Sequence, residues 1–223
     1  MRSILNIVFI FLSINISIKA QDIIVFDDSL KNSLIGEELE YLEDVYGDLK
    51  IDDIRESKDF LPVSGKVPNL GVSKSVYWFR IKIQNQTSSN LLINLAYPLI
   101  DYLDFFSFDT SGNLISKCSL GDLIKYENRL IDHQENVFSL RAQKGEIREI
   151  FFRVKSEEQL VIPLILGTNN NIYSDLINRD LFSGIYFGLI LVIFLYNLFI
   201  YFSVKDKSYL FYVLYILFFG LTQ

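Results

Sequence analysis

Residues 76–85, VYWFRIKIQN, decide the fold that the sequence predicts. Along this segment Tyr77, Phe79, Ile81 and Ile83 alternate with Trp78, Arg80, Lys82 and Gln84. Alternation of period two is typical of a β-strand with one buried and one exposed face. The segment therefore predicts a strand. It places Trp78, the only tryptophan of the chain, on the solvent side beside Arg80.

More segments with strand character lie on both sides of this one. They are residues 23–26, as a first edge strand, 91–97, 102–108, 147–155 and 160–167. Turn sequences such as NQTSSN, DTSGN and RAQKGE separate most of them. Many short strands with little helix indicate a mainly β protein, an antiparallel, jelly-roll-like β-sandwich.

Residues 36–46 differ, because their apolar residues recur every three or four positions. This spacing predicts a short amphipathic helix that ends at Gly47. Its five carboxylates are Glu37, Glu38, Glu40, Glu43 and Asp44. Their spacing does not match a twelve-residue calcium loop, so a solvated helix face is favoured over a calcium site.

The charge and the rare residues exclude several functions. The 223-residue chain has a net charge of −6; without residues 1–20 and 181–223, 17 basic and 26 acidic residues remain. Such an acidic surface repels nucleic acid and anionic lipid. A single cysteine, Cys118, excludes an internal disulfide and a cysteine metal cluster. A single histidine, His133, excludes the usual zinc sites, and we expect an ordinary core or surface role for it. We expect no metal and no cofactor.

The first twenty residues resemble an export signal. Arg2 precedes a short apolar core, and Ala20 offers a small residue for cleavage. Residues 1–20 are therefore predicted to be a signal peptide, with an uncleaved anchor helix as the alternative. Under either reading residues 21–172 form an exported sensory β-sandwich.

A charge-free segment near the end predicts a membrane helix. Residues 181–204 are long enough to cross a hydrocarbon core of roughly 30 Å. Residues 209–223 are too short to span and predict the start of a second helix in a truncated bundle of a larger protein. Lys205 and Lys207 indicate the retained side. We expect an inner-membrane protein with residues 21–180 in the periplasm or outside the cell.

Polar and small residues in the first membrane segment favour a bundle over a single anchor. Asn197 lies inside the apolar stretch, where an amide seeks a partner on another helix. Gly184 and Gly188 form a small-xxx-small pair that permits close helix approach.

Several segments together resemble one receptor family. They are VYWFRIKIQN (76–85), YPLIDYLDFFSFDTSGN (97–113), SLGD (119–122), IFFRVKS (150–156) and GIYFGLILVIFLYNLFIYFSVKDKSYLFYVLYI (184–216). Their order resembles the bacterial seven-transmembrane receptors with diverse intracellular signalling modules, with the type-two extracellular domain, from about residue 35 onward. The resemblance implies a jelly-roll-like extracellular domain for carbohydrate or other small ligands. It also implies seven helices that pass the signal to a cytoplasmic kinase, cyclase or phosphatase.

No catalytic arrangement is recognisable, so no enzyme is expected from this chain, and a membrane-bound hydrolase lacks an acid–base pair. The candidate ligand-binding residues are Trp78, Arg80, Asp101 and Asp104. Trp78 with Arg80 is either a framework pair or a sugar platform, and the resemblance favours framework. Asp101 and Asp104, three apart in a strand, point to opposite faces, which disfavours a shared site. The sequon at Asn85 is read as a turn.

The leading functional hypothesis is a sensory receptor whose exported sandwich binds a small-molecule or carbohydrate ligand and biases a helix bundle. The alternative is a surface-anchored glycan-binding module that does not signal. The short linker of residues 169–180 favours tight docking of the sandwich on the membrane face over a free tether. Expected partners are the ligand and the membrane, without nucleic acid. A homodimer is left open.

Overall fold

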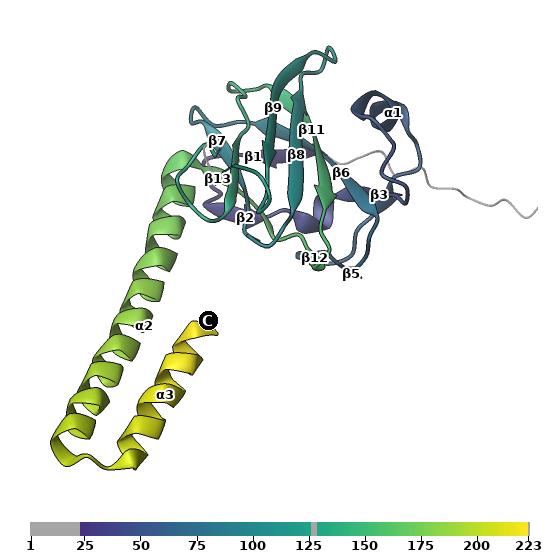
Figure 1. Cartoon of the computed structure of the whole chain (residues 1–223). Helices are drawn as coiled ribbons and strands as arrows, with labels where there is room; N and C mark the ends of the chain where they lie inside the picture. The colour runs from purple at the N-terminus through teal and green to yellow at the C-terminus, as the bar shows by residue number, and fades with distance from the viewer. Residues whose placement is uncertain (1–22, 126–128, 223) are drawn as a thin grey trace, which may run out of the picture.

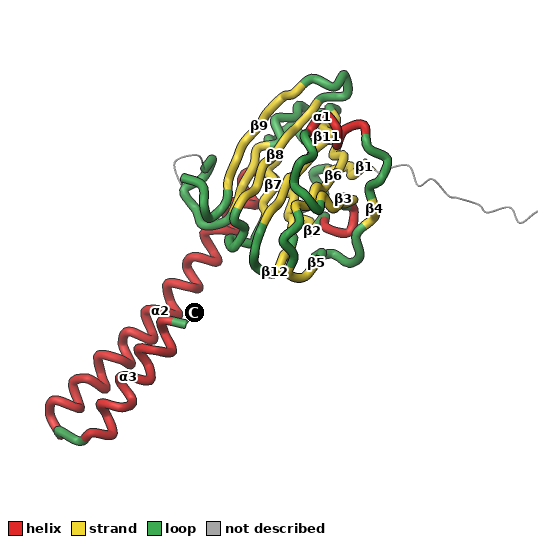
Figure 2. Tube along the Cα trace, turned by 45° about the vertical axis from the view of Figure 1, so that its right-hand side comes forward, coloured by secondary structure: helices red, strands yellow, loops and turns green. Residues whose placement is uncertain are grey.

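The computed structural model describes residues 23–125 and 129–222. A β-sandwich is followed by a long helix that leads away from it and by a second helix that runs back beside the first (Figures 1 and 2). The predicted signal peptide, residues 1–20, lies outside the described residues.

The larger sheet is organised around the strand that the sequence predicts at residues 76–85. Its seven strands are β1 (Ile23–Phe26), β3 (Glu40–Asp44), β4 (Leu61–Pro62), β6 (Val76–Asn85), β8 (Tyr102–Phe108), β9 (Leu114–Leu120) and β11 (Ile147–Lys155). The order is β4-β3-β6-β11-β8-β9, antiparallel throughout, while β1 pairs with β6 in parallel. Along one edge of β6 runs β11; along the other, β3 pairs with its first half and β1 with its second. The strand predicted at residues 76–85 is confirmed.

The smaller sheet faces the larger one. Its order is β10 (Asn136–Ser139), β7 (Leu91–Leu95), β13 (Leu164–Thr168), β2 (Asn32–Leu34), all antiparallel, and β5 (Asn69–Val72) pairs separately with β12 (Gln159–Val161). The single strand predicted over residues 160–167 is therefore wrong, since two strands of different sheets share it. Pro163, which has no N–H to donate, lies between them.

The inner faces of the two sheets enclose the main core. Phe79 and Ile81 of β6 and Ile93 of β7 are fully buried there. Phe105 of β8 stacks on Phe138 of β10 with ring centroids 4.7 Å apart, so the sheets are in direct contact. The predicted antiparallel β-sandwich is confirmed, while its jelly-roll connectivity stays a prediction.

The outer face of the larger sheet carries a second core, which we also call the outer core. This core overturns the solvent-facing position expected for Trp78. Its buried members are Leu42, Ile54, Phe60, Val76, Trp78, Phe106, Phe108 and Phe151. Ile54 comes from α1 (Ile51–Glu56), which packs over this face. Both faces of β6 are therefore buried at residues 76–79, because β8 and β11 present phenylalanines beside Trp78, while Arg80, Lys82 and Gln84 stay partly exposed.

The helix predicted for residues 36–46 is also wrong. A short 3-10 turn (Gly36–Glu38) leads into strand β3. Leu39 belongs to the main core and Leu42 to the second core, so the spacing of three reflects two buried faces rather than one helical stripe. Gly47, with φ 73°, follows the strand, and its N–H donates to the Asp44 carboxylate at 2.8 Å.

The segment expected to link sandwich and membrane is itself helical. Helix α2 (Asn169–Val204) begins directly after β13, and the Thr168 hydroxyl accepts a hydrogen bond from the Asn171 N–H at 3.4 Å. Among the described residues α2 is the one helix long and apolar enough to cross a membrane. Helix α3 (Lys207–Leu221) follows after a two-residue break.

The two helices contact each other without using the predicted glycine pair. A Cβ at Gly184 or Gly188 would meet no atom within 4 Å among the described residues. Gly220 of α3 instead faces α2, where a Cβ would lie 3.3 Å from Ile190. Asn197 is buried, and its amide donates to the Ile193 carbonyl of the same helix at 2.8 Å.

Candidate functional site

Trp78 has no ring face open to a ligand in this structure. Its side chain is 1% exposed and packs on Phe106, with ring centroids 6.0 Å apart. The guanidinium of Arg153 lies 6.0 Å from the centroid of its ring, whereas that of Arg80 lies over the ring of Phe60. The geometry is that of a packed framework residue, and a ligand-binding role for Trp78 stays a prediction.

Arg80 is occupied by protein partners. Its Nη2 and Nε donate to one carboxylate oxygen of Glu40 on β3, at 2.6 and 3.0 Å. Its guanidinium also lies 4.1 Å from the ring centroid of Phe60. Arg80 therefore covers Phe60, whereas the sequence suggested that it would cover Trp78.

Asp101 and Asp104 have separate partners. The Asp104 carboxylate on β8 accepts a hydrogen bond from the Ser119 hydroxyl at 2.5 Å and lies 3.6 Å from Arg153. Asp101 precedes the strand, and its carboxylate accepts from the Glu157 N–H at 2.9 Å. These contacts hold loops and strands together and leave a shared site as an untested prediction. No group of three metal-ligating side chains occurs in residues 23–125 and 129–222.

A cleft of about 300 Å³ opens where the edges of the two sheets meet. It lies between β9, the edge of the larger sheet, and β10, the edge of the smaller one. Its described lining residues are Phe105, Ser116, Lys117, Cys118, Arg129, Leu130, Val137, Phe138, Ser139 and Arg141. The cleft was not predicted, because its residues come from segments that no local motif connects.

Cys118 lies on the inner side of this cleft. It pairs with Phe105 across β8 and β9 and is half-buried. Burial raises the pKa of the Cys118 thiol, and the Asp104 carboxylate raises it further, while Arg141 acts in the opposite direction. The thiol is therefore protonated and weakly nucleophilic at neutral pH, which argues against cysteine catalysis in the cleft.

The first turns of α2 pack on the outer face of the smaller sheet. Ile172 and Leu176, four residues apart on the helix, are buried against Leu92 of β7 and Val137 of β10. Asn32 of β2 donates to the Asp175 carboxylate, and the Asn171 amide donates to the Lys31 carbonyl at 3.1 Å. The segment expected to be a short linker is thus part of a helix that packs on the sandwich, while docking of the sandwich on the membrane face stays a prediction.

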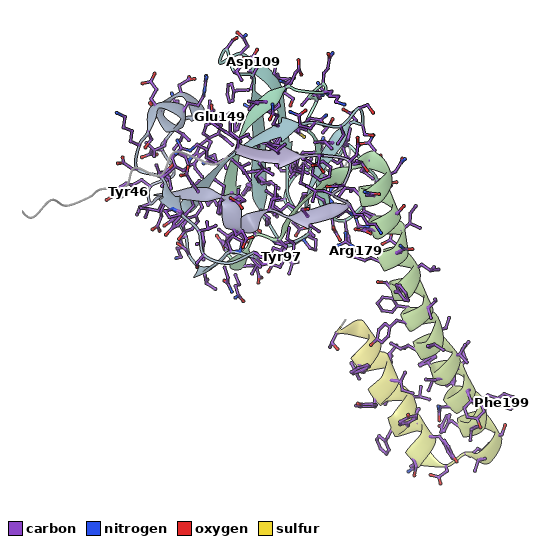
Figure 3. All side chains as sticks on the ribbon, turned by 180° about the vertical axis from the view of Figure 1, so that it is seen from behind. Tyr46, Tyr97, Asp109, Glu149, Arg179 and Phe199 are labelled. Atoms are coloured by element: carbon purple, nitrogen blue, oxygen red, sulfur yellow. The ribbon has the colours of Figure 1, made fainter. Side chains whose placement is uncertain are left out.

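The next turn of α2 is fastened to the sandwich by the ion pair Glu135–Arg179 and the hydrogen bond His133–Asp180, and we call these two contacts together the α2 joint. Arg179 Nη1 lies 2.6 Å from Oε1 of Glu135, and the other carboxylate oxygen of Glu135, Oε2, accepts a hydrogen bond from the Asn94 amide at 2.6 Å. Figure 3 shows Arg179 on the part of α2 nearest the sandwich. Glu135 is 7% exposed, so these two partners replace the water that an exposed carboxylate would contact.

His133 takes part in the same joint. Its Nδ1 accepts a hydrogen bond from the Glu135 N–H at 3.0 Å, which places the ring proton on Nε2. Nε2 faces the Asp180 carboxylate at 3.2 Å. His133 thus links the loop before β10 to the helix, a role that its isolated position in the sequence did not indicate.

Arg129 connects the cleft to the α2 joint. This residue lines the cleft, and its Nη1 donates to the carbonyls of His133 and Gln134, at 2.6 Å each. A displacement of Arg129 would therefore move the backbone that carries His133 and Glu135. The cleft and the membrane helix share one short segment, residues 129–139.

Breaking the joint is expected to loosen the first turns of α2. Arg179→Ala removes a hydrogen-bonded partner of a buried carboxylate, worth about 1–2 kcal/mol at this half-exposed site. Amide hydrogen exchange in residues 169–180 should rise about tenfold. Asn178→Ala, at an exposed neighbouring position, is the matched control. Equal exchange in both variants would show that the ion pair does not fasten the helix.

The comparisons with known proteins agree with this arrangement. Residues 36–168 match the family model described as 7TMR-DISM extracellular 2, and residues 179–223 match the one described as 7TM diverse intracellular signalling. No curated protein matches the chain. The first match covers the sandwich, and the second begins at Arg179 in the α2 joint. The chain belongs to the seven-transmembrane receptors with diverse intracellular signalling modules, with a type-two extracellular domain followed by the start of the seven-helix region.

Proposed function

We propose that this chain is the sensing part of an inner-membrane receptor whose exported sandwich binds a small ligand, such as a carbohydrate, in the cleft between β9 and β10. Residues 129–139 support the proposal, because they line the cleft and also supply His133 and Glu135 to the α2 joint. Occupancy of the cleft would shift Arg129 and, through two backbone carbonyls, the contacts of α2. A ligand changes signalling only if it binds two such arrangements unequally.

The signal would then travel along α2 as a rigid element. The helix is continuous from the sheet face at Ile172 to Val204, without a break at the membrane boundary. A rotation or shift at Arg179 is therefore carried into the membrane and to α3, which packs beside it.

Inserting a flexible Gly/Ser segment after Asp180 in the full-length receptor tests this coupling. Ligand binding should persist, because the cleft is untouched, while ligand-dependent output should be lost. An insertion of equal length at Ser111, in the turn between β8 and β9, is the control and should leave both unchanged. Normal signalling by the Asp180 insertion would refute the coupling model.

A second candidate function is a surface-anchored glycan-binding module that does not signal. The open cleft on the exported domain is compatible with it, since capture alone needs no joint to the helix. It predicts that the gene encodes no output module after the membrane helices. Reading the gene past codon 223 separates the two functions.

A further inference from the structure

We propose that the cleft between β9 and β10 selects a small organic anion, a carboxylate on a body the size of a single sugar, with Arg141 as the group that recognises the charge. This inference rests on the proposed function, because it names the ligand class of the same cleft. A volume of about 300 Å³ is at the lower end of small-molecule sites.

The charge of the cleft carries the first part of the argument. Its charged lining residues, as far as the structure describes them, are Lys117, Arg129 and Arg141, and no Asp or Glu lines it. The chain as a whole has more acidic than basic residues, so the cleft opposes the overall charge. A concave surface lined by one sign of charge concentrates ligands of the other sign.

The three cations are not equivalent. The Lys117 ammonium lies 5.2 Å from the ring centroid of Phe106, a member of the outer core, so it contributes to the cleft only from a distance. Arg129 donates to two backbone carbonyls. The guanidinium of Arg141 has no hydrogen bond or ion pair to any described residue, and its side chain is exposed at the rim.

The backbone at Arg141 is held in an unusual conformation. Its φ is 48°, in the left-handed region that residues with a Cβ adopt only at a cost. The Arg141 carbonyl accepts a hydrogen bond from buried Arg148 at 2.7 Å, and Arg148 is in turn paired with Glu146 at 2.6 Å. Non-glycine residues in this region cluster at functional sites, where the surrounding structure maintains the strain. Here the strained backbone holds the Cα–Cβ bond of Arg141 at the mouth of the cleft.

The interior of the cleft suits the rest of such a ligand. The Ser116 hydroxyl is buried and has no hydrogen-bond partner in the described part of the chain. A buried hydroxyl without a partner is unfavourable and is satisfied by a polar ligand group. Behind it, Phe105 and Phe138 form an apolar wall. A guanidinium at the rim can bind a carboxylate through two parallel N–H donors, and the serine hydroxyl inside can form a hydrogen bond with a ligand hydroxyl. Together they match a hydroxylated carboxylate.

Calorimetric titration with the chain in detergent micelles tests the proposal. The probes are glucuronate, galacturonate and gluconate, each compared with the neutral sugar or alditol that lacks the carboxylate. At least one carboxylate should bind ten times more tightly than its neutral partner. Arg141→Gln should weaken that binding at least tenfold and Arg141→Lys less, because lysine keeps the charge without the fork. Lys144→Gln removes one exposed charge nearby and should have no effect.

Two further measurements locate the site and exclude unfolding. Cys118, the only cysteine, lines the cleft, so bound carboxylate should slow its alkylation at about pH 8.5. Arg141→Gly should retain the melting temperature, because glycine adopts this φ without strain, yet it should lose carboxylate binding.

The proposal is overturned if no carboxylate protects Cys118, or if Arg141→Gln binds the carboxylate as tightly as the wild type does. A neutral sugar that protects Cys118 equally well also overturns it but leaves the receptor function intact. Carboxylate binding that never changes output would defeat the receptor function alone.

Discussion

Trp78→Ala is expected to lower the free energy of unfolding of the sandwich by about 3–5 kcal/mol. The ring is 1% exposed and is among the largest fully buried side chains of the described residues. Phe106, Phe151 and Ile54 surround it in the outer core, on strands and a helix whose positions are fixed by other contacts. The cavity left by alanine would therefore collapse only in part.

The measurement is urea unfolding of residues 21–180, which keep the turns of α2 that pack on the sandwich, followed by far-ultraviolet circular dichroism because the substitution removes the only tryptophan. Arg80→Ala is the comparison and should cost less, about 1–2 kcal/mol, since it removes the Glu40 pair and the cover of Phe60 without opening the core. A glycan array run beside the melts tests the alternative role. A Trp78→Ala variant that is as stable as the wild type but has lost glycan binding would establish the sugar platform instead.

The sequence predicted the strand at residues 76–85 but not that both faces of its first half, residues 76–79, are buried. Alternation within one strand reports which face is more apolar. The charged side chains of Arg80 and Lys82 therefore predicted that one face is exposed to solvent. Phe106 and Phe151, which cover Trp78, come from strands that only the sheet order places beside it. The same limit explains β3, where Leu39 and Leu42 serve different cores and imitate a helical spacing.

Local sequence patterns could not predict the α2 joint or the cleft, for a related reason. His133 has no partner near it in sequence, and its partner Asp180 belongs to a segment read as a linker. The three asparagines at residues 169–171 disfavour helix on propensity alone. Packing of Ile172 and Leu176 on the sheet, together with the Thr168 cap, outweighs that preference. The family resemblance found the domain order, but the residues of the cleft needed the sheet topology.

Asn85→Ala is expected to lower the free energy of unfolding by about 2–4 kcal/mol, the second large loss. The side chain is 1% exposed, and its carbonyl oxygen accepts from the N–H and the hydroxyl of Thr87, both at 2.9 Å. Its amide donates to the Ala142 carbonyl at 2.8 Å and the Ser89 carbonyl at 3.1 Å. Alanine would leave the buried Thr87 hydroxyl and the Ala142 carbonyl with fewer partners.

These four hydrogen bonds also decide the meaning of the sequon at Asn85. Both amide hydrogens are used inside the fold, so a glycan on this nitrogen would displace the turn that follows β6. Ser88→Ala, at an exposed position of the same turn, is the matched control and should change stability little. Asn85→Asp should be worse than alanine at neutral pH, because a carboxylate would face two carbonyl oxygens, and should recover in part at about pH 3, where the neutral acid donates again. Wild-type stability in Asn85→Ala would mean that the end of β6 is held by its backbone pairing with β11 and β1 alone.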